Sequence, residues 1–203
     1  MRKKRKRLTR KITARSRKNI EEKLDRFFNE YASGETHVAV TFPPEELKGI
    51  GGQRVKAVAR TIQRLLVREF GVKGYRLIEF SKHKKTQLCD IPHFHFVVDG
   101  PVAQDDFEAL VSNELGWGRD LIRDGTLILI KKGHAGLARY LAKTNVPKDK
   151  RCDSIPSQFG QIRRVFDGFG WRVKGASTVR PKLRPKPFGP GGRGFRFRKP
   201  DQR

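Results

Sequence analysis

The distribution of charge along this chain limits where a folded core can form. Residues 1–18 contain 11 lysines and arginines and no acidic residue, and residues 172–203 contain 11 basic residues and one acid, Asp201. The 153 residues between them hold 24 basic and 20 acidic side chains. We therefore expect one folded domain over residues 19–175, between two basic tails that are disordered when free: residues 1–18, and the Pro/Gly/Arg-rich residues 176–203.

The net charge of +25 indicates a polyanionic partner, and nucleic acid is the commonest one. No apolar run approaches the roughly 20 residues of a membrane helix, and the tails lack an amphipathic face, so no membrane partner is expected. The sequence contains only two cysteines. This number argues against a disulfide-stapled extracellular domain and favours a reducing compartment.

Apolar periodicity divides the body into alternating helices and strands. Helical spacing predicts helices over residues 19–32, 53–70, 105–115 and 134–144, and β-rich runs predict strands over residues 37–42, 75–81, 92–98 and 126–130. The second and third strands are joined by a loop without a helix, so they should be antiparallel neighbours. The sequence predicts an α+β fold with a single central antiparallel sheet and helices packed on one face.

Two histidines alternate with two phenylalanines in the third strand. Because alternate residues of a strand share a face, His93 and His95 point one way, and Phe94 and Phe96 point the other way into the core. Two imidazoles at this spacing can bind one divalent metal ion. The same pattern also fits two polar residues on an exposed strand face.

A third ligand is expected from the neighbouring strand. Glu79 is the favoured carboxylate, and Asp90 is the competing one. Cys89 offers a zinc alternative, in which only the distant Cys152 could complete four ligands. The remaining histidines are interpreted as ordinary surface or loop residues: His37, His83 and His134.

Tyr140 and Lys143 lie three residues apart, on one side of the predicted helix over residues 134–144. A tyrosine at the edge of an apolar stripe is common without any chemical role. The functional interpretation is a phenol nucleophile with a lysine that stabilises the phenolate or holds a phosphate.

Four segments in order resemble a known family: residues 38–44 (VAVTFPP), 75–80 (YRLIEF), 92–96 (PHFHF) and 140–143 (YLAK). Together they resemble the rolling-circle replication initiators of plasmids and small DNA phages, which are HUH endonucleases. The resemblance covers roughly residues 36–170. It implies a ferredoxin-like or RRM-like HUH fold, in the cytoplasm of a bacterial or archaeal host.

The resemblance also implies roles for the residues above. His93, His95 and Glu79 would bind Mg²⁺ or Mn²⁺, Tyr140 would attack single-stranded origin DNA to give a 5′-phosphotyrosine, and Lys143 would be the lysine of the motif. No nucleotide cofactor is needed, because the covalent link retains the phosphodiester energy. No GxxxxGK[ST] motif occurs, so unwinding and synthesis would require a host helicase and polymerase.

Two features depart from the family pattern. Residues 82–91 make a longer connection than the usual short turn, and Thr144 stands where two-tyrosine relatives have a second tyrosine. Further DNA contacts are expected from arginines and from aromatic side chains that stack on bases: Arg163, Arg164, Phe195, Arg196, Phe197 and Arg198. A one-tyrosine HUH transposase and a non-enzymatic basic nucleic-acid-binding protein remain alternatives.

Overall fold

The computed structural model describes residues 10–171, except 32–33, 48, 83–88, 119–121, 123–126, 135, 148–150, 161 and 163. The chain divides into two units, residues 1–171 and residues 172–203. All described residues belong to the first unit, so the predicted C-terminal tail lies outside them.

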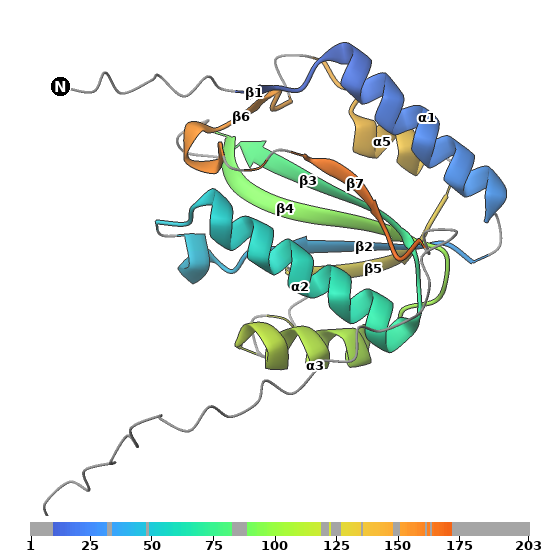
Figure 1. Cartoon of the computed structure of the whole chain (residues 1–203), viewed down its shortest axis with the longest axis vertical. Coiled ribbons are helices and arrows are strands. Elements are labelled where there is room, and N and C mark those ends of the chain that lie inside the picture. The colour runs from blue at the N-terminus through green and yellow to red at the C-terminus, as the bar shows by residue number, and fades with distance from the viewer. Residues whose placement is uncertain are drawn as a thin grey trace, which may run out of the picture. The chain divides into compact units, whose positions relative to one another are not determined.

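The first unit is built around a five-stranded sheet with the strand order β5-β2-β4-β3-β7, in which every pair is antiparallel (Figure 1). These strands are β2 (Thr36–Thr41), β3 (Gly74–Lys82), β4 (Cys89–Val98), β5 (Ile128–Lys132) and β7 (Phe166–Phe169). The helices are α1 (Ala14–Glu30), α2 (Gly52–Phe70), α3 (Gln104–Leu115) and α5 (Leu137–Ala142). Short 3-10 helices, η1 (Pro44–Leu47) and η3 (Ser157–Phe159), and a two-stranded ribbon of β1 (Arg10–Lys11) with β6 (Ser154–Ile155) complete the described elements. The predicted α+β class with a central antiparallel sheet is confirmed.

One face of this sheet is wholly apolar at its centre. Val38, Val40, Phe94 and Phe96 are fully buried there, and they pack against the apolar stripes of α2 and α3. The α2 helix ends where Gly71 takes a left-handed conformation, which glycine adopts at no steric cost. This layer is the main core of the unit.

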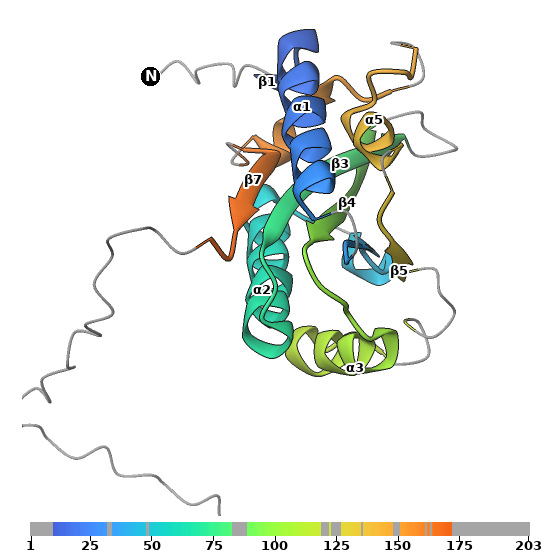
Figure 2. The ribbon, with the colours of Figure 1, turned by 90° about the vertical axis from the view of Figure 1, so that its right-hand side faces the viewer.

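The opposite face carries helices as well, so the prediction that helices cover one face is wrong. Leu77 and Val97 project from that face and are buried beneath α1 and α5, with Leu24 and Leu141 among the contacting residues. Figure 2 shows α1 and α5 on one side of β3 and β4, with α2 and α3 on the other. The physical reason is that α1 and α5 have apolar stripes of their own, which need an apolar surface to cover.

The N-terminal boundary of the folded part also differs from the prediction. The Thr13 hydroxyl accepts the backbone N–H of Ser16 and caps α1, which begins at Ala14 and not at Asn19. Arg17 is buried and β1 pairs with β6, so residues 10–18 belong to the folded unit and are not tail.

No strand was predicted over residues 166–169, but these residues form β7 at the edge of β3. The segment is too short to show a strand period. Its strand conformation depends on the backbone groups that β3 presents, with Leu77 opposite Phe166 and Tyr75 opposite Gly168.

Candidate metal centre

The register of β3 and β4 brings the three predicted metal ligands together. Glu79 pairs with His93, and Leu77 pairs with His95, so all three candidate side chains lie on the α1/α5 side of the sheet. One carboxylate oxygen, Glu79 Oε2, lies 3.4 Å from His93 Nε2 and 3.1 Å from His95 Nε2. Their candidate ligand atoms lie within 4.8 Å of one another. Among the described residues, no other group of three His, Cys, Asp or Glu side chains has this geometry.

The long connection between β3 and β4 leaves this register intact. Pairing runs without interruption from Gly74 to Ser81, and the register shifts only between Ser81 and Lys82. Residues 83–88 lie outside the described residues. The additional residues of this connection therefore lie beyond the Glu79–His93 pair. They do not separate the Glu79 carboxylate from the two imidazoles.

The two ligand histidines are each held through their other ring nitrogen. His37 Nε2 lies 3.0 Å from His95 Nδ1, and the Ser81 hydroxyl lies 3.3 Å from His93 Nδ1. Both Nε2 atoms are thereby directed toward Glu79. Outer hydrogen bonds of this kind fix the orientation of metal-binding imidazoles.

The interpretation of His37 as an ordinary surface or loop residue is wrong. Its side chain is buried in β2, and its ring stacks on that of His95 with 5.2 Å between centroids. The signal was present in the sequence, because His37 begins an alternating strand whose partner is the strand of the two ligand histidines. The strand order was needed to recognise it. His134, by contrast, is exposed as expected, and His83 lies outside the described residues.

Charge and burial set the protonation of the site. Burial by itself would raise the pKa of Glu79, but hydrogen bonds from His93 and His95 and the Lys143 charge outweigh it and hold that pKa well below its usual range. Burial, the largest cause, lowers the pKa of His95. Burial and the charge of His95 lower the pKa of His37 to about 3. The site therefore presents an ionised Glu79 carboxylate beside the His95 imidazole, which burial keeps neutral, and metal binding requires these states of the two groups.

These donors fit a divalent cation. Two imidazole nitrogens and one carboxylate suit manganese, iron or zinc better than magnesium, which prefers an all-oxygen shell. Asp90 and Cys89 lie in β4, but their side chains are outside the described part of the chain. Glu79 is thus the carboxylate that the described residues place at the site, and the Asp90 and Cys89 alternatives stay untested.

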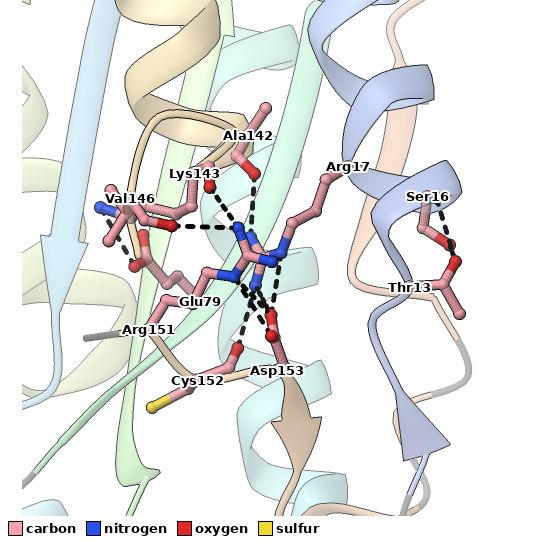
Figure 3. A network of polar contacts seen from close by, with 10 residues as sticks. All are labelled: Thr13, Ser16, Arg17, Glu79, Ala142, Lys143, Val146, Arg151, Cys152 and Asp153. Carbon is pink, nitrogen blue, oxygen red and sulfur yellow. Dashed lines mark hydrogen bonds and ion pairs between the residues drawn. The ribbon is translucent and has the colours of Figure 1, made fainter. Parts of the chain in front are cut away.

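Lys143, directly after α5, approaches the same carboxylate and also lies over the ring of Tyr140. Lys143 Nζ lies 3.3 Å from Glu79 Oε1 and 4.0 Å from the centre of the Tyr140 ring (Figure 3 shows the Lys143–Glu79 pair). Tyr140 is half exposed. The predicted helix over residues 134–144 is too long, because α5 ends at Ala142 and Lys143 takes a left-handed conformation with φ of 55°. The lysine reaches the site from the residue after the helix, not from its face.

A cavity of about 190 Å³ opens beside the candidate ligands. Glu79 and Ser81 line one part of it, and Lys143, Val146 and Arg151 line another. Two cationic side chains therefore line the same space as the Glu79 carboxylate. Such a lining suits a phosphate group.

Of the predicted DNA contacts, only Arg164 lies within the described residues. Arg164 is exposed, and its guanidinium lies 3.7 Å from Asp167. The other predicted contacts fall outside the described residues: Arg163, Phe195, Arg196, Phe197 and Arg198.

Comparison of the chain with protein-family models, with curated proteins and with solved structures finds no match. The resemblance to HUH endonucleases therefore depends on the residues of the site alone. In the described part of the chain, no helix is both long enough and apolar enough to cross a lipid bilayer.

Proposed function

We propose that this protein nicks and rejoins single-stranded DNA through a phosphotyrosine formed on Tyr140, as an initiator of rolling-circle replication. One observation carries the proposal. Glu79 contacts both imidazoles through one oxygen and Lys143 through the other, and the Lys143 ammonium lies over the Tyr140 ring. Candidate metal ligands and a cation from two distant parts of the sequence thus meet around one carboxylate, and that cation also contacts the ring of the candidate nucleophile.

Glu79, His93 and His95 would hold Mn²⁺ or Mg²⁺, and their donor set favours Mn²⁺. When bound, such an ion polarises a non-bridging phosphate oxygen and neutralises charge that develops during phosphoryl transfer. His37 and Ser81 would keep the two imidazoles oriented for it.

Tyr140 would supply the nucleophile. Its phenolic oxygen attacks the phosphorus in line with the bond to the 3′ oxygen, so a phosphorus–tyrosine bond forms as the phosphorus–O3′ bond breaks. The phenolic proton is lost to solvent, and the departing 3′ oxygen gains one. The products are a 5′-phosphotyrosine and a free 3′-hydroxyl that can prime synthesis.

Lys143 would assist at two points. Its ammonium lies 4.0 Å from the centre of the Tyr140 ring, so a cation stands beside the residue that attacks the phosphate. It also lines the cavity beside Glu79, where it can hold a phosphate oxygen. Attack by an incoming 3′-hydroxyl on the phosphotyrosine reverses the reaction and reseals the strand, without a nucleotide cofactor.

The charge of the chain supports a DNA partner. A net charge of +25 gives a phosphate affinity that does not depend on base sequence and that weakens as salt rises. Recognition of an origin, and cooperation with a host helicase and polymerase, belong to the same proposal.

The test is covalent capture. The full chain is incubated with Mn²⁺ and a randomised pool of single-stranded oligonucleotides labelled at the 3′ end. We expect a labelled adduct that survives denaturing gel electrophoresis, disappears with EDTA, and maps by mass spectrometry to the peptide of Tyr140. The same pool labelled at the 5′ end should leave the adduct unlabelled.

Tyr140→Phe should abolish the adduct and leave DNA binding intact, and Tyr31→Phe is the matched control that should behave as wild type. An adduct that persists in Tyr140→Phe refutes the assignment of the nucleophile. DNA binding with no adduct under any metal condition supports a non-enzymatic binding protein. The DNA ends selected from the pool distinguish an initiator from a transposase with the same chemistry.

A further inference from the structure

The segment that carries Tyr140 and Lys143 is too short to hold its own position. The α5 helix has six residues, and isolated helices need about 12–15 residues even to be marginally stable in water. Lys143, directly after it, has the one positive φ among the described non-glycine residues. Contacts from elsewhere in the fold must therefore set the geometry of this segment.

Arg17 of α1 supplies the first set of contacts. Its NH1 donates to the carbonyl of Ala142 at 2.9 Å, and its NH2 donates to the carbonyl of Cys152 at 3.1 Å. Its Nε and NH2 both donate to Asp153 Oδ1, at 3.0 and 2.8 Å. The residue is 5% exposed, so a guanidinium has been buried at the end of α5 with its donors occupied.

Arg151 supplies the second set. Its NH1 donates to the carbonyl of Lys143 at 2.8 Å and to the carbonyl of Val146 at 3.1 Å. Its Nε donates to Asp153 Oδ2 at 3.1 Å. Carbonyls at the end of a helix lack partners within the helix, and Arg151 satisfies two of those that follow α5.

Asp153 joins the two arginines, as Figure 3 shows. Its carboxylate accepts hydrogen bonds from both guanidinium groups. Burial would raise its pKa, but Arg17 and Arg151 hold that pKa below its usual range, so the carboxylate stays ionised. We call Arg17, Arg151 and Asp153 the arginine clamp.

We propose that the arginine clamp is a positioning device for the reaction, which fixes the end of α5 so that Lys143 is held between Glu79 and Tyr140. The two arginines of the clamp contact the backbone on both sides of Lys143, at Ala142 and Val146, as well as Lys143 itself. Glu79, Lys143 and Arg151 line the same cavity, so loss of the clamp disturbs the site directly. The importance of the clamp for nicking depends on the function proposed above.

The test measures the position of Lys143 without metal or DNA. The full chain is pulse-labelled with trace acetic anhydride, and peptide mapping compares acetylation of Lys143 with that of Lys56 on α2. The Lys143 side chain is 16% exposed in its pair with Glu79, so release should raise its relative labelling at least about threefold in Arg151→Met. Arg54→Met is the matched control, because Arg54 makes a similar pair with Glu46 and belongs to α2.

Arg151→Lys keeps a cation with donors and should restore part of the protection of Lys143. Wild-type labelling of Lys143 in Arg151→Met, with native near-ultraviolet circular dichroism, overturns the proposal. If Arg151→Met does not fold, the same labelling experiment is done with Asp153→Asn. This substitution keeps the volume of the side chain and removes its charge.

A second readout separates this proposal from the proposed function. If DNA nicking occurs, Arg151→Met should lower kcat toward the value of Lys143→Met. If nicking does not occur, the labelling result still decides whether the clamp positions Lys143. A purely structural role would lower the midpoint of thermal unfolding but leave the Lys143/Lys56 labelling ratio unchanged.

Discussion

Side chains alternate between the two faces of the central sheet, and the two faces have different roles. One face forms the main core, and the other carries the candidate metal ligands. Behind the sheet, Phe94 and Phe96 are fully buried against α2 and α3. In front of it, His93 and His95 share their face with apolar residues such as Val97, which α1 and α5 cover. The candidate ligand histidines therefore stand on a strand whose rear phenylalanines are fully buried. A rigid rear layer limits the movement of the imidazoles, and this is what a metal site requires.

The largest effect should come from the rear face. Phe94→Ala removes a fully buried ring between the two ligand histidines, and it should lower the free energy of unfolding by about 3–5 kcal/mol. Urea unfolding followed by circular dichroism measures the change. Leu129→Ala is the control, because Leu129 is 40% exposed and its loss should change stability by about 0.5 kcal/mol or less. If the two variants lowered the free energy of unfolding equally, the rear face would not be the main source of stability.

On the front face, Glu79→Gln should remove most of the metal affinity. Glu79 is the one described carboxylate that meets both imidazoles, so its loss should weaken Mn²⁺ binding by more than the roughly 10- to 100-fold that outer hydrogen-bond partners contribute. Isothermal titration calorimetry measures the dissociation constant, and His134→Ala, at an exposed histidine, serves as the control. Unchanged Mn²⁺ affinity in Glu79→Gln would assign the metal to other ligands.

His37→Ala should have a smaller effect on the same measurement. His37 does not meet Glu79, but it holds His95 through Nδ1, so its removal should weaken Mn²⁺ binding about 10- to 100-fold. If His37→Ala weakens binding as much as Glu79→Gln, then His37 is itself a ligand. If it has no effect, the hydrogen bond to His95 does not orient the site.

The two faces also differ in how much of them could be predicted from the sequence. The alternation in β4, with the carboxylate of β3, sufficed to group Glu79, His93 and His95, because strand period is a local property and two strands joined without a helix are expected to be antiparallel neighbours. The role of His37 and the covering of the front face by α1 and α5 depend on strand order and on packing between distant segments. The alternation that begins at His37 could not be interpreted without the strand order, so the sequence alone did not reveal these features.

The start of α1 and the arginine clamp were missed for a related reason. A run of basic residues near a terminus has the composition of a solvated tail, and Arg17 lies within such a run. Only its contacts with Asp153 and the end of α5 show that it is buried. The conformation of Lys143 was missed because φ of a residue after a helix depends on the contacts that hold it.

The smallest predicted effect concerns pH and the clamp. Because the folded-state pKa of Asp153 is depressed, its pairs with Arg17 and Arg151 stabilise the fold above the unfolded-state pKa, and this stabilisation is lost as pH falls through the folded-state pKa. The stability difference between wild type and Asp153→Asn should therefore be largest near neutral pH and should shrink steadily below about pH 4. Solvent screens the carboxylate, which is 34% exposed, so the difference is expected to be small beside that of Phe94→Ala. Urea unfolding of both proteins between pH 7 and pH 2 measures it, and a difference that grew on acidification would mean that Asp153 does not act as the ionised link between the two arginines.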